Sequence, residues 1–145
     1  MKYKTVYAVA FLLCAVTIAA AVPDQPFMQA ARADLQTAKR ELQRATANKG
    51  GHRAKAISLT NQAIAQVNQG IDYDRRRNHA STFKAESSFA GTPDQPHMTA
   101  AVAALESAKN NLERATADKG GHRAKALDLV RDAIDQVKKG IDASR

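Results

Sequence analysis

Residues 28–45 read MQAARADLQTAKRELQRA and place apolar side chains alternately three and four positions apart. This spacing keeps the apolar side chains on one stripe of an α-helix. The stripe consists of Met28, Ala31, Leu35, Ala38, Leu42 and Ala45. Large residues alternate with alanine along it, so we expect a second helix to pack closely against this face.

The same pattern occurs again 70 positions later, where residues 98–115 read MTAAVAALESAKNNLERA. Between positions 23–72 and 93–142, 32 of the 50 aligned residues are identical, which indicates duplication of a whole structural unit. The second stripe consists of Met98, Ala101, Leu105, Ala108, Leu112 and Ala115. Differences between the copies fall mostly off the stripe, as burial of the stripe would require.

The second half of each unit predicts another helix. Its apolar face consists of Ile57, Ile64, Val67 and Ile71 in the first copy and of Leu127, Val130, Ile134, Val137 and Ile141 in the second. The face continues past Gly70, so we expect the helix to run through this glycine. Gly50 and Gly120 suit the left-handed residue that ends a helix, and the turn is short enough to make the two helices of each unit antiparallel.

These patterns predict an all-α protein built from two tandem antiparallel helical hairpins. A lone hairpin has few large apolar side chains to bury, so two hairpins packed as a four-helix bundle are the natural arrangement. Pairing of hairpins between chains, giving a homo-oligomer, is the alternative. The predicted organisation is a signal peptide over 1–21, a hairpin over 22–73, a linker over 74–92 and a hairpin over 93–145.

The first 21 residues have the features of a secretory signal peptide. Lys2 and Lys4 precede an uncharged, mostly apolar run over 6–20, and Ala21 ends a small-residue cleavage site. An uncleaved anchor is the alternative, although the run is short for a membrane span. Cleavage near Ala21 predicts a periplasmic or secreted protein that keeps no stable membrane span and also loses Cys14, the single cysteine.

The chain is basic, with 22 Lys and Arg against 14 Asp and Glu and a formal net charge of +8. Such a balance favours anionic partners or surfaces. The run Arg75-Arg76-Arg77 lies in the predicted linker, where a solvated segment is the favoured interpretation. The predicted export disfavours nucleic acid as a partner, which leaves an envelope protein or an anionic polymer.

Basic residues crowd around the Gly-Gly turn of each hairpin. They are Lys49, His52, Arg53 and Lys55 in the first copy and Lys119, His122, Arg123 and Lys125 in the second. Cations at a helix start oppose the helix dipole, and open backbone amides there favour anions. These residues therefore predict an anion-binding turn; a solvated basic turn is the competing interpretation.

Asp94, His97 and Asp142 are expected near the open end of the second hairpin. Carboxylates and imidazole together can hold a divalent metal ion, which makes a metal-sequestering protein the alternative function. The competing interpretation is helix capping by Asp94 and an ordinary exposed histidine. The first copy has Phe27 in place of His97, which weakens the metal hypothesis.

The sequence contains no motif that gathers a nucleophile with its base, and no glycine-rich phosphate loop that follows a strand. No two histidines lie three or four residues apart, the spacing of a helical metal site. We therefore expect a non-enzymatic binding or structural protein without a cofactor.

Two strings, PDQPHM at 93–98 and KGGHRAKAL at 119–127, resemble a group of small exported bacterial proteins that carry one such hairpin. The resemblance covers both repeats, is most specific at residues 49–56, and implies the fold and the compartment but no activity. A looser similarity connects the chain with periplasmic small metal-binding proteins. Their helices are rich in histidine and these are not, so this similarity also implies only fold and compartment.

Overall fold

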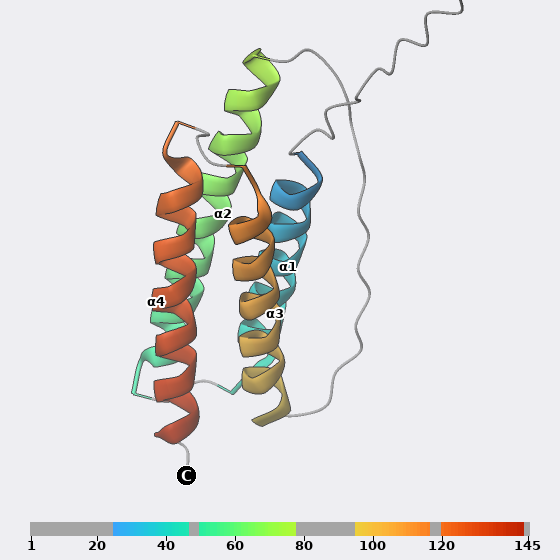
Figure 1. Cartoon of the computed structure of the whole chain (residues 1–145). Helices are drawn as coiled ribbons and strands as arrows, with labels where there is room; N and C mark the ends of the chain where they lie inside the picture. Colours follow the sequence, from blue (N-terminus) through green and yellow to red (C-terminus); the bar gives the residue numbers. More distant parts are fainter. Residues whose placement is uncertain (1–24, 47–49, 78–94, 117–119, 144–145) are drawn as a thin grey trace, which may run out of the picture.

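The computed structural model describes residues 25–46, 50–77, 95–116 and 120–143. Within these ranges the chain forms four α-helices and no strand (Figure 1). They are α1 (Gln25–Arg44), α2 (His52–Arg77), α3 (Gln95–Arg114) and α4 (His122–Asp142). The all-α prediction is therefore confirmed, whereas the predicted signal peptide, Cys14 and Asp94 lie outside the described residues. None of these four helices has a segment long and apolar enough to cross a bilayer.

A Gly-Gly turn with left-handed backbone angles precedes α2, which follows α1, and another precedes α4, which follows α3. The φ angles are 59° and 76° at Gly50 and Gly51, and 64° and 76° at Gly120 and Gly121. A side chain is disfavoured in this region of backbone space, so the conformation explains why both copies have glycine here. We call α1 and α2 hairpin 1, and α3 and α4 hairpin 2.

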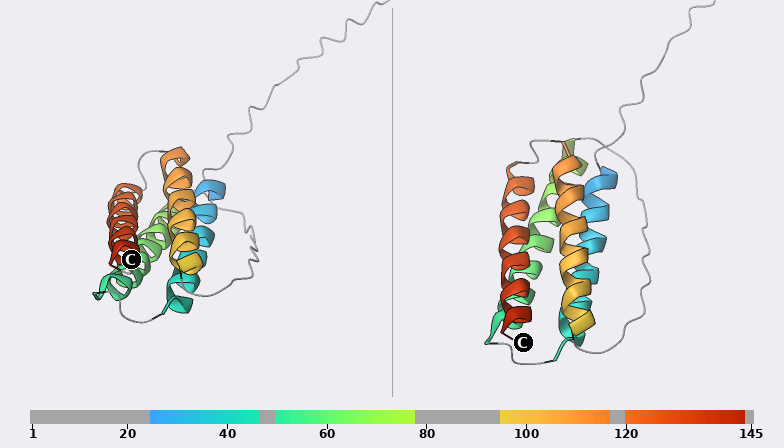
Figure 2. Two further views of the ribbon diagram at one scale, coloured as in Figure 1. Left: turned by 90° about the horizontal axis from the view of Figure 1, so that it is seen from below. Right: turned by 60° about the horizontal axis from the view of Figure 1, so that its bottom comes forward.

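The two hairpins pack side by side as a four-helix bundle. In the described residues α1 lies beside α2 and α3, α4 lies beside α2 and α3, and the diagonal pairs α1–α4 and α2–α3 have no Cα atoms within 8 Å of each other. Figures 1 and 2 show that the two turns lie at opposite ends of the bundle, so α1 runs antiparallel to α3 and α2 runs antiparallel to α4. The hairpins are therefore related by an approximate two-fold rotation.

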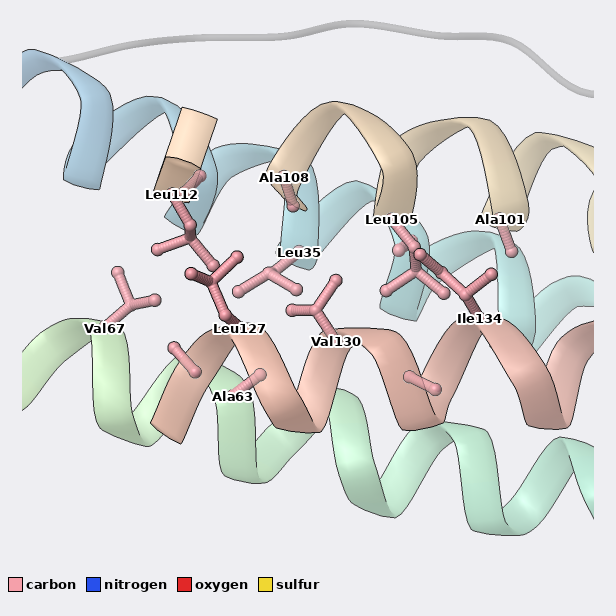
Figure 3. Packing of buried hydrophobic residues seen from close by; sticks show 14 of the residues in the cluster. Leu35, Ala63, Val67, Ala101, Leu105, Ala108, Leu112, Leu127, Val130 and Ile134 are labelled. Carbon is pink, nitrogen blue, oxygen red and sulfur yellow. The ribbon is translucent and has the colours of Figure 1, made fainter. Parts of the chain in front are cut away.

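The core consists of the apolar stripes that the spacing of three and four residues predicts. All twelve stripe residues of α1 and α3 are buried, including Leu35 and Leu105, which are fully buried. Figure 3 shows leucines of α1 and α3 packed against Val130 and Ile134 of α4. Ile57, Ile64 and Ile141 are only partly buried and pack against the edge of the core. Ala56, Ala63 and Val67 are buried along α2. The small alanine side chains let α4 approach α2 closely.

Two features of α2 bear on its predicted end. The helix runs through the buried Gly70, as predicted, but it also continues to Arg77, so the start of the linker at residue 74 was wrong. Asp74 is only 6% exposed, and the carboxylate of Asp72 lies 3.6 Å from the guanidinium of Arg75. Arginine is a good helix former, and such pairs at three-residue spacing support a helix. The arginine run therefore prolongs α2.

Candidate functional site

The arginine of each Gly-Gly turn caps the helix that precedes the turn. Arg53 Nε donates to the carbonyl oxygen of Leu42 at 2.6 Å, and its Nη2 donates to that of Gln43 at 3.0 Å. Arg123 Nη1 donates in the same way to Leu112 at 2.9 Å and to Ala115 at 3.0 Å. The last carbonyls of a helix lack partners within it and carry partial negative charge. The arginine thus begins one helix while it stabilises the end of another.

The histidine of each turn contacts the opposite hairpin. His52 Nδ1 lies 2.9 Å from Gln136 Oε1, and His122 Nδ1 lies 2.9 Å from Gln66 Oε1. An amide oxygen only accepts, so Nδ1 is the donor in both contacts. The two histidines are 70 positions apart, and so are the two glutamines, so this is one contact made twice by the two-fold arrangement. Each turn is therefore fastened to the hairpin that it does not belong to.

The residues of the predicted anion site thus divide into three groups. The arginines and histidines donate to protein oxygens, Lys55 and Lys125 are exposed, and Lys49 and Lys119 lie outside the described residues. The structure accordingly gives the arginines a capping role that explains the breach of the helix-dipole rule without a ligand. Anion binding at the turns stays a prediction.

We expect Arg53→Lys to lower the free energy of unfolding by about 1–2 kcal/mol, since hydrogen bonds from charged donors contribute roughly this much. Lysine keeps the charge but cannot reach two neighbouring carbonyl oxygens with a planar fork. Urea unfolding followed by circular dichroism measures the change. Lys55→Ala, at an exposed position in the same turn of α2, is the control and should change stability by less than about 0.5 kcal/mol. Equal effects of the two substitutions would contradict the capping role.

His97 is buried in a contact between the hairpins, not exposed at an open end. It is 7% exposed, and its Nδ1 lies 2.6 Å from Oε2 of Glu41, which is 4% exposed. Glu41 Oε1 also accepts from Arg44 Nη1 at 3.2 Å. The interpretation of His97 as an ordinary exposed histidine is therefore wrong, because the two-fold packing covers it with α1.

The metal hypothesis receives no further ligand from the described residues. In the ranges that the structure describes, no three His, Cys, Asp or Glu side chains gather into a metal-binding group. His97 and Asp142 are both within these ranges, whereas Asp94 is not. Metal binding at these three residues stays a prediction.

Two further contacts between α1 and α3 involve residues that the sequence did not single out. Asp34 Oδ2 accepts from Ser107 Oγ and from Asn111 Nδ2, each at 2.8 Å. The guanidinium of Arg114 lies 4.4 Å from the ring centre of Phe27, a cation–π distance. The copies differ at positions 27, 34 and 41 of hairpin 1 and at the equivalent 97, 104 and 111 of hairpin 2. They differ as well at the equally spaced positions 29, 36 and 43, so the sequence alone does not single out these contacts.

A groove of about 390 Å³ lies between α1 and α3. Asp34, Thr37 and Glu41 line one wall, and alanines with Ser107 line the other. Both carboxylates already accept hydrogen bonds across the interface. The groove therefore has a small apolar surface, and both of its acids already have hydrogen-bond partners in the protein. None of the residues that line it is an activated nucleophile.

Charge is distributed differently over the two hairpins. On hairpin 2 four cations pair with acids, and the pairs are Lys109–Glu113 at 3.2 Å, Arg131–Glu113 at 3.6 Å, Lys138–Glu106 at 3.6 Å and Lys139–Asp135 at 2.6 Å. In the described ranges Lys125 makes no ion pair, like its equivalent Lys55. On hairpin 1, Arg32, Lys39 and Lys55 make no ion pair in the described ranges, and Arg40 donates only to the hydroxyl of Thr37. Hairpin 1 therefore carries cations without acidic partners.

Comparison of the chain with protein-family models, curated proteins and solved structures found no match.

Proposed function

We propose that this protein is a non-enzymatic exported helical module of the bacterial envelope that binds an anionic polymer through the basic surface of hairpin 1. The observation that carries the proposal is the contrast in ion pairing between the hairpins. A cation that has no acidic neighbour keeps its full field for an external anion. The proposal concerns the side of α1 that carries Arg32, Lys39 and Arg40.

Equivalent positions of the two hairpins support this choice of surface. On hairpin 2 a groove of about 330 Å³ is lined by Glu106, Lys109 and Asn110 of α3 together with residues of α4. The corresponding positions of α1 are occupied by Gln36, Lys39 and Arg40. On α1 an acid is thus replaced by an amide and an amide by a cation, whereas α2 carries Asn61 and Asn68 where α4 has Arg131 and Lys138. The net charge of this surface is the same in both hairpins, but on hairpin 1 its cations lie on α1 with no acid among them.

The Gly-Gly turns are the weaker binding surface in this proposal. Their arginines donate to carbonyl oxygens, and redirecting them to a ligand would leave those oxygens without a donor. Lys55 and Lys125 are exposed beside the turns and add long-range attraction. The flank of α1 needs no such rearrangement before it meets an anion.

We expect the triple variant Arg32→Gln, Lys39→Gln, Arg40→Gln to bind inorganic polyphosphate about tenfold more weakly at low salt. Exposed charge contacts contribute up to roughly 1 kcal/mol each, so three of them account for this loss. Binding is measured by fluorescence anisotropy at several salt concentrations, because screening should weaken the wild-type interaction. Poly-glutamate in place of polyphosphate tests whether carboxylates serve as well as phosphates.

The control is the triple variant Lys109→Gln, Arg131→Gln, Lys138→Gln on hairpin 2. It removes the same number of charges, so a difference between the two variants reports position and not net charge. We expect its affinity to stay within about threefold of the wild type, because these cations are already paired. Equal losses in both variants, or no binding by the wild type, would refute the proposed surface.

A further inference from the structure

We propose that the inner face of hairpin 1 is a recognition surface for hairpin 2 that discriminates against a second copy of hairpin 1. Its specificity resides in six pairing positions, which are 27, 34 and 41 on α1 and 97, 104 and 111 on α3. The inference is independent of polyanion binding, because these positions lie between the helices and not on the basic flank.

The apolar stripes of α1 and α3 do not distinguish the hairpins. The six stripe residues of α1 are identical to those of α3, so a pair of two hairpins 1 would bury the same stripe as the observed pair. The histidine–glutamine contacts do not distinguish them either, because both hairpins carry both residues. Any preference of hairpin 1 for hairpin 2 therefore has to come from positions where the copies differ.

The six pairing positions meet this requirement. In hairpin 1 they are Phe27, Asp34 and Glu41, and in hairpin 2 they are His97, Ala104 and Asn111. Five of these residues make a contact that crosses the α1–α3 interface. The contacts are His97–Glu41, Asp34 with Ser107 and Asn111, and Arg114 over Phe27. In the observed pair each acid of α1 thus meets a neutral donor or a histidine.

Two copies of hairpin 1 in the same two-fold geometry would lose these partners. Position 41 would lie opposite Phe27, and Asp34 would lie opposite Thr37 and Glu41 of the second copy. The buried Glu41 would then face an aromatic ring and keep only Arg44 of its own helix as a donor. Two carboxylates would also approach each other on each side of the axis. Burial of unpaired or like charges is strongly unfavourable, which makes this pairing poor.

Two copies of hairpin 2 would suffer less. His97 would lie opposite Asn111, and Ala104 would lie opposite Ser107, so donors would lack Asp34 but no carboxylate would be stranded. Rejection thus depends mainly on hairpin 1, where both acids lie. Specificity of this kind comes from repulsion in the wrong pair as much as from attraction in the right one.

The test uses the full chain and exchanges residues between equivalent positions. The full exchange is Phe27→His, Asp34→Ala, Glu41→Asn, His97→Phe, Ala104→Asp and Asn111→Glu. By the two-fold symmetry it rebuilds the three contacts on the other side of the axis. We expect its unfolding equilibrium constant in urea to stay within about tenfold of the wild type, with the same mass by light scattering.

The half exchange His97→Phe, Ala104→Asp, Asn111→Glu gives both hairpins the residues of hairpin 1. We expect the unfolding constant to rise on the order of a hundredfold or more, because Glu41 loses His97, Asp34 loses Asn111 and carboxylates then face each other across the interface. The control Gln36→Glu, Gln43→Glu also adds two carboxylates, but at exposed positions of α1, and should leave the constant within about threefold.

Rescue decides the outcome. A full exchange that restores the stability lost in the half exchange supports the recognition surface, since the six substitutions then matter only as matched sets. A full exchange as unstable as the half exchange would overturn it, as would a half exchange with wild-type stability and mass.

Discussion

Leu35→Ala should lower the free energy of unfolding by about 2–5 kcal/mol, the usual cost of emptying a leucine site in a close-packed core. Leu35 is fully buried and faces residues of the other hairpin (Figure 3). The loss therefore weakens packing between the hairpins as well as within hairpin 1. Urea unfolding followed by far-UV circular dichroism measures it, with the slope of the transition as a check for two-state behaviour.

Leu105→Ala provides a matched comparison because Leu105 occupies the equivalent site in α3 and is also fully buried. The two substitutions should cost the same within about 1 kcal/mol, whereas Gln36→Ala on the exposed side of α1 should cost less than about 0.5 kcal/mol. Widely different losses at the two leucines would contradict the two-fold arrangement, and no loss at either would contradict their burial.

His97→Phe should lower the free energy of unfolding by about 3–5 kcal/mol, because it removes the partner of a buried carboxylate. Glu41 Oε2 would lose its contact at 2.6 Å and keep on its other oxygen only Arg44, whose side chain is 49% exposed. Phenylalanine fits the symmetry of the site, since hairpin 1 has Phe27 at the equivalent position. The loss therefore reports the stranded charge more than a change of shape.

The double variant His97→Phe, Glu41→Asn should recover most of this loss and lie within about 1 kcal/mol of the wild type. It copies the residue pair Phe27 and Asn111 that the other side of the axis already carries. A double-mutant cycle then gives the coupling between the two positions. Additive losses in the single and double variants would show that His97 and Glu41 do not act as a pair.

The hairpins were predictable from the sequence because their causes are local. Periodic burial in α1 and α3, the passage of α2 through Gly70 and the left-handed turn at Gly50 all follow from neighbours a few residues apart. The end of α2 was placed wrongly because a run of arginines was interpreted as linker, although arginine favours helix and Asp72 pairs with Arg75. The charged composition of this segment indicated a solvated linker, whereas the helix propensity of arginine extends α2 to Arg77.

The contacts of the candidate site were not predictable in the same way. The partner of His97 is 56 positions away, and it becomes a neighbour only because the two turns lie at opposite ends of the bundle. Apolar periodicity is equally compatible with hairpins packed in the same direction. Arg53 illustrates the same difficulty, because the carbonyl oxygens that it binds lie in α1, on the other side of the turn. The sequence showed that the turn is positively charged, but not which oxygens its arginine contacts.

The opposed turns also place a condition on how the two copies are joined. Helix α2 ends at one end of the bundle and α3 begins at the other, so the connecting chain has to span a helix of 20 residues, or about 30 Å. The 17 residues between Arg77 and Gln95 can reach roughly 56 Å, whereas a connection of fewer than about nine residues would fall short. With so short a linker, each hairpin could complete a bundle of this kind only by packing against a hairpin of a second chain. A linker of 17 residues is long enough for both hairpins of one chain to pack together in the same bundle.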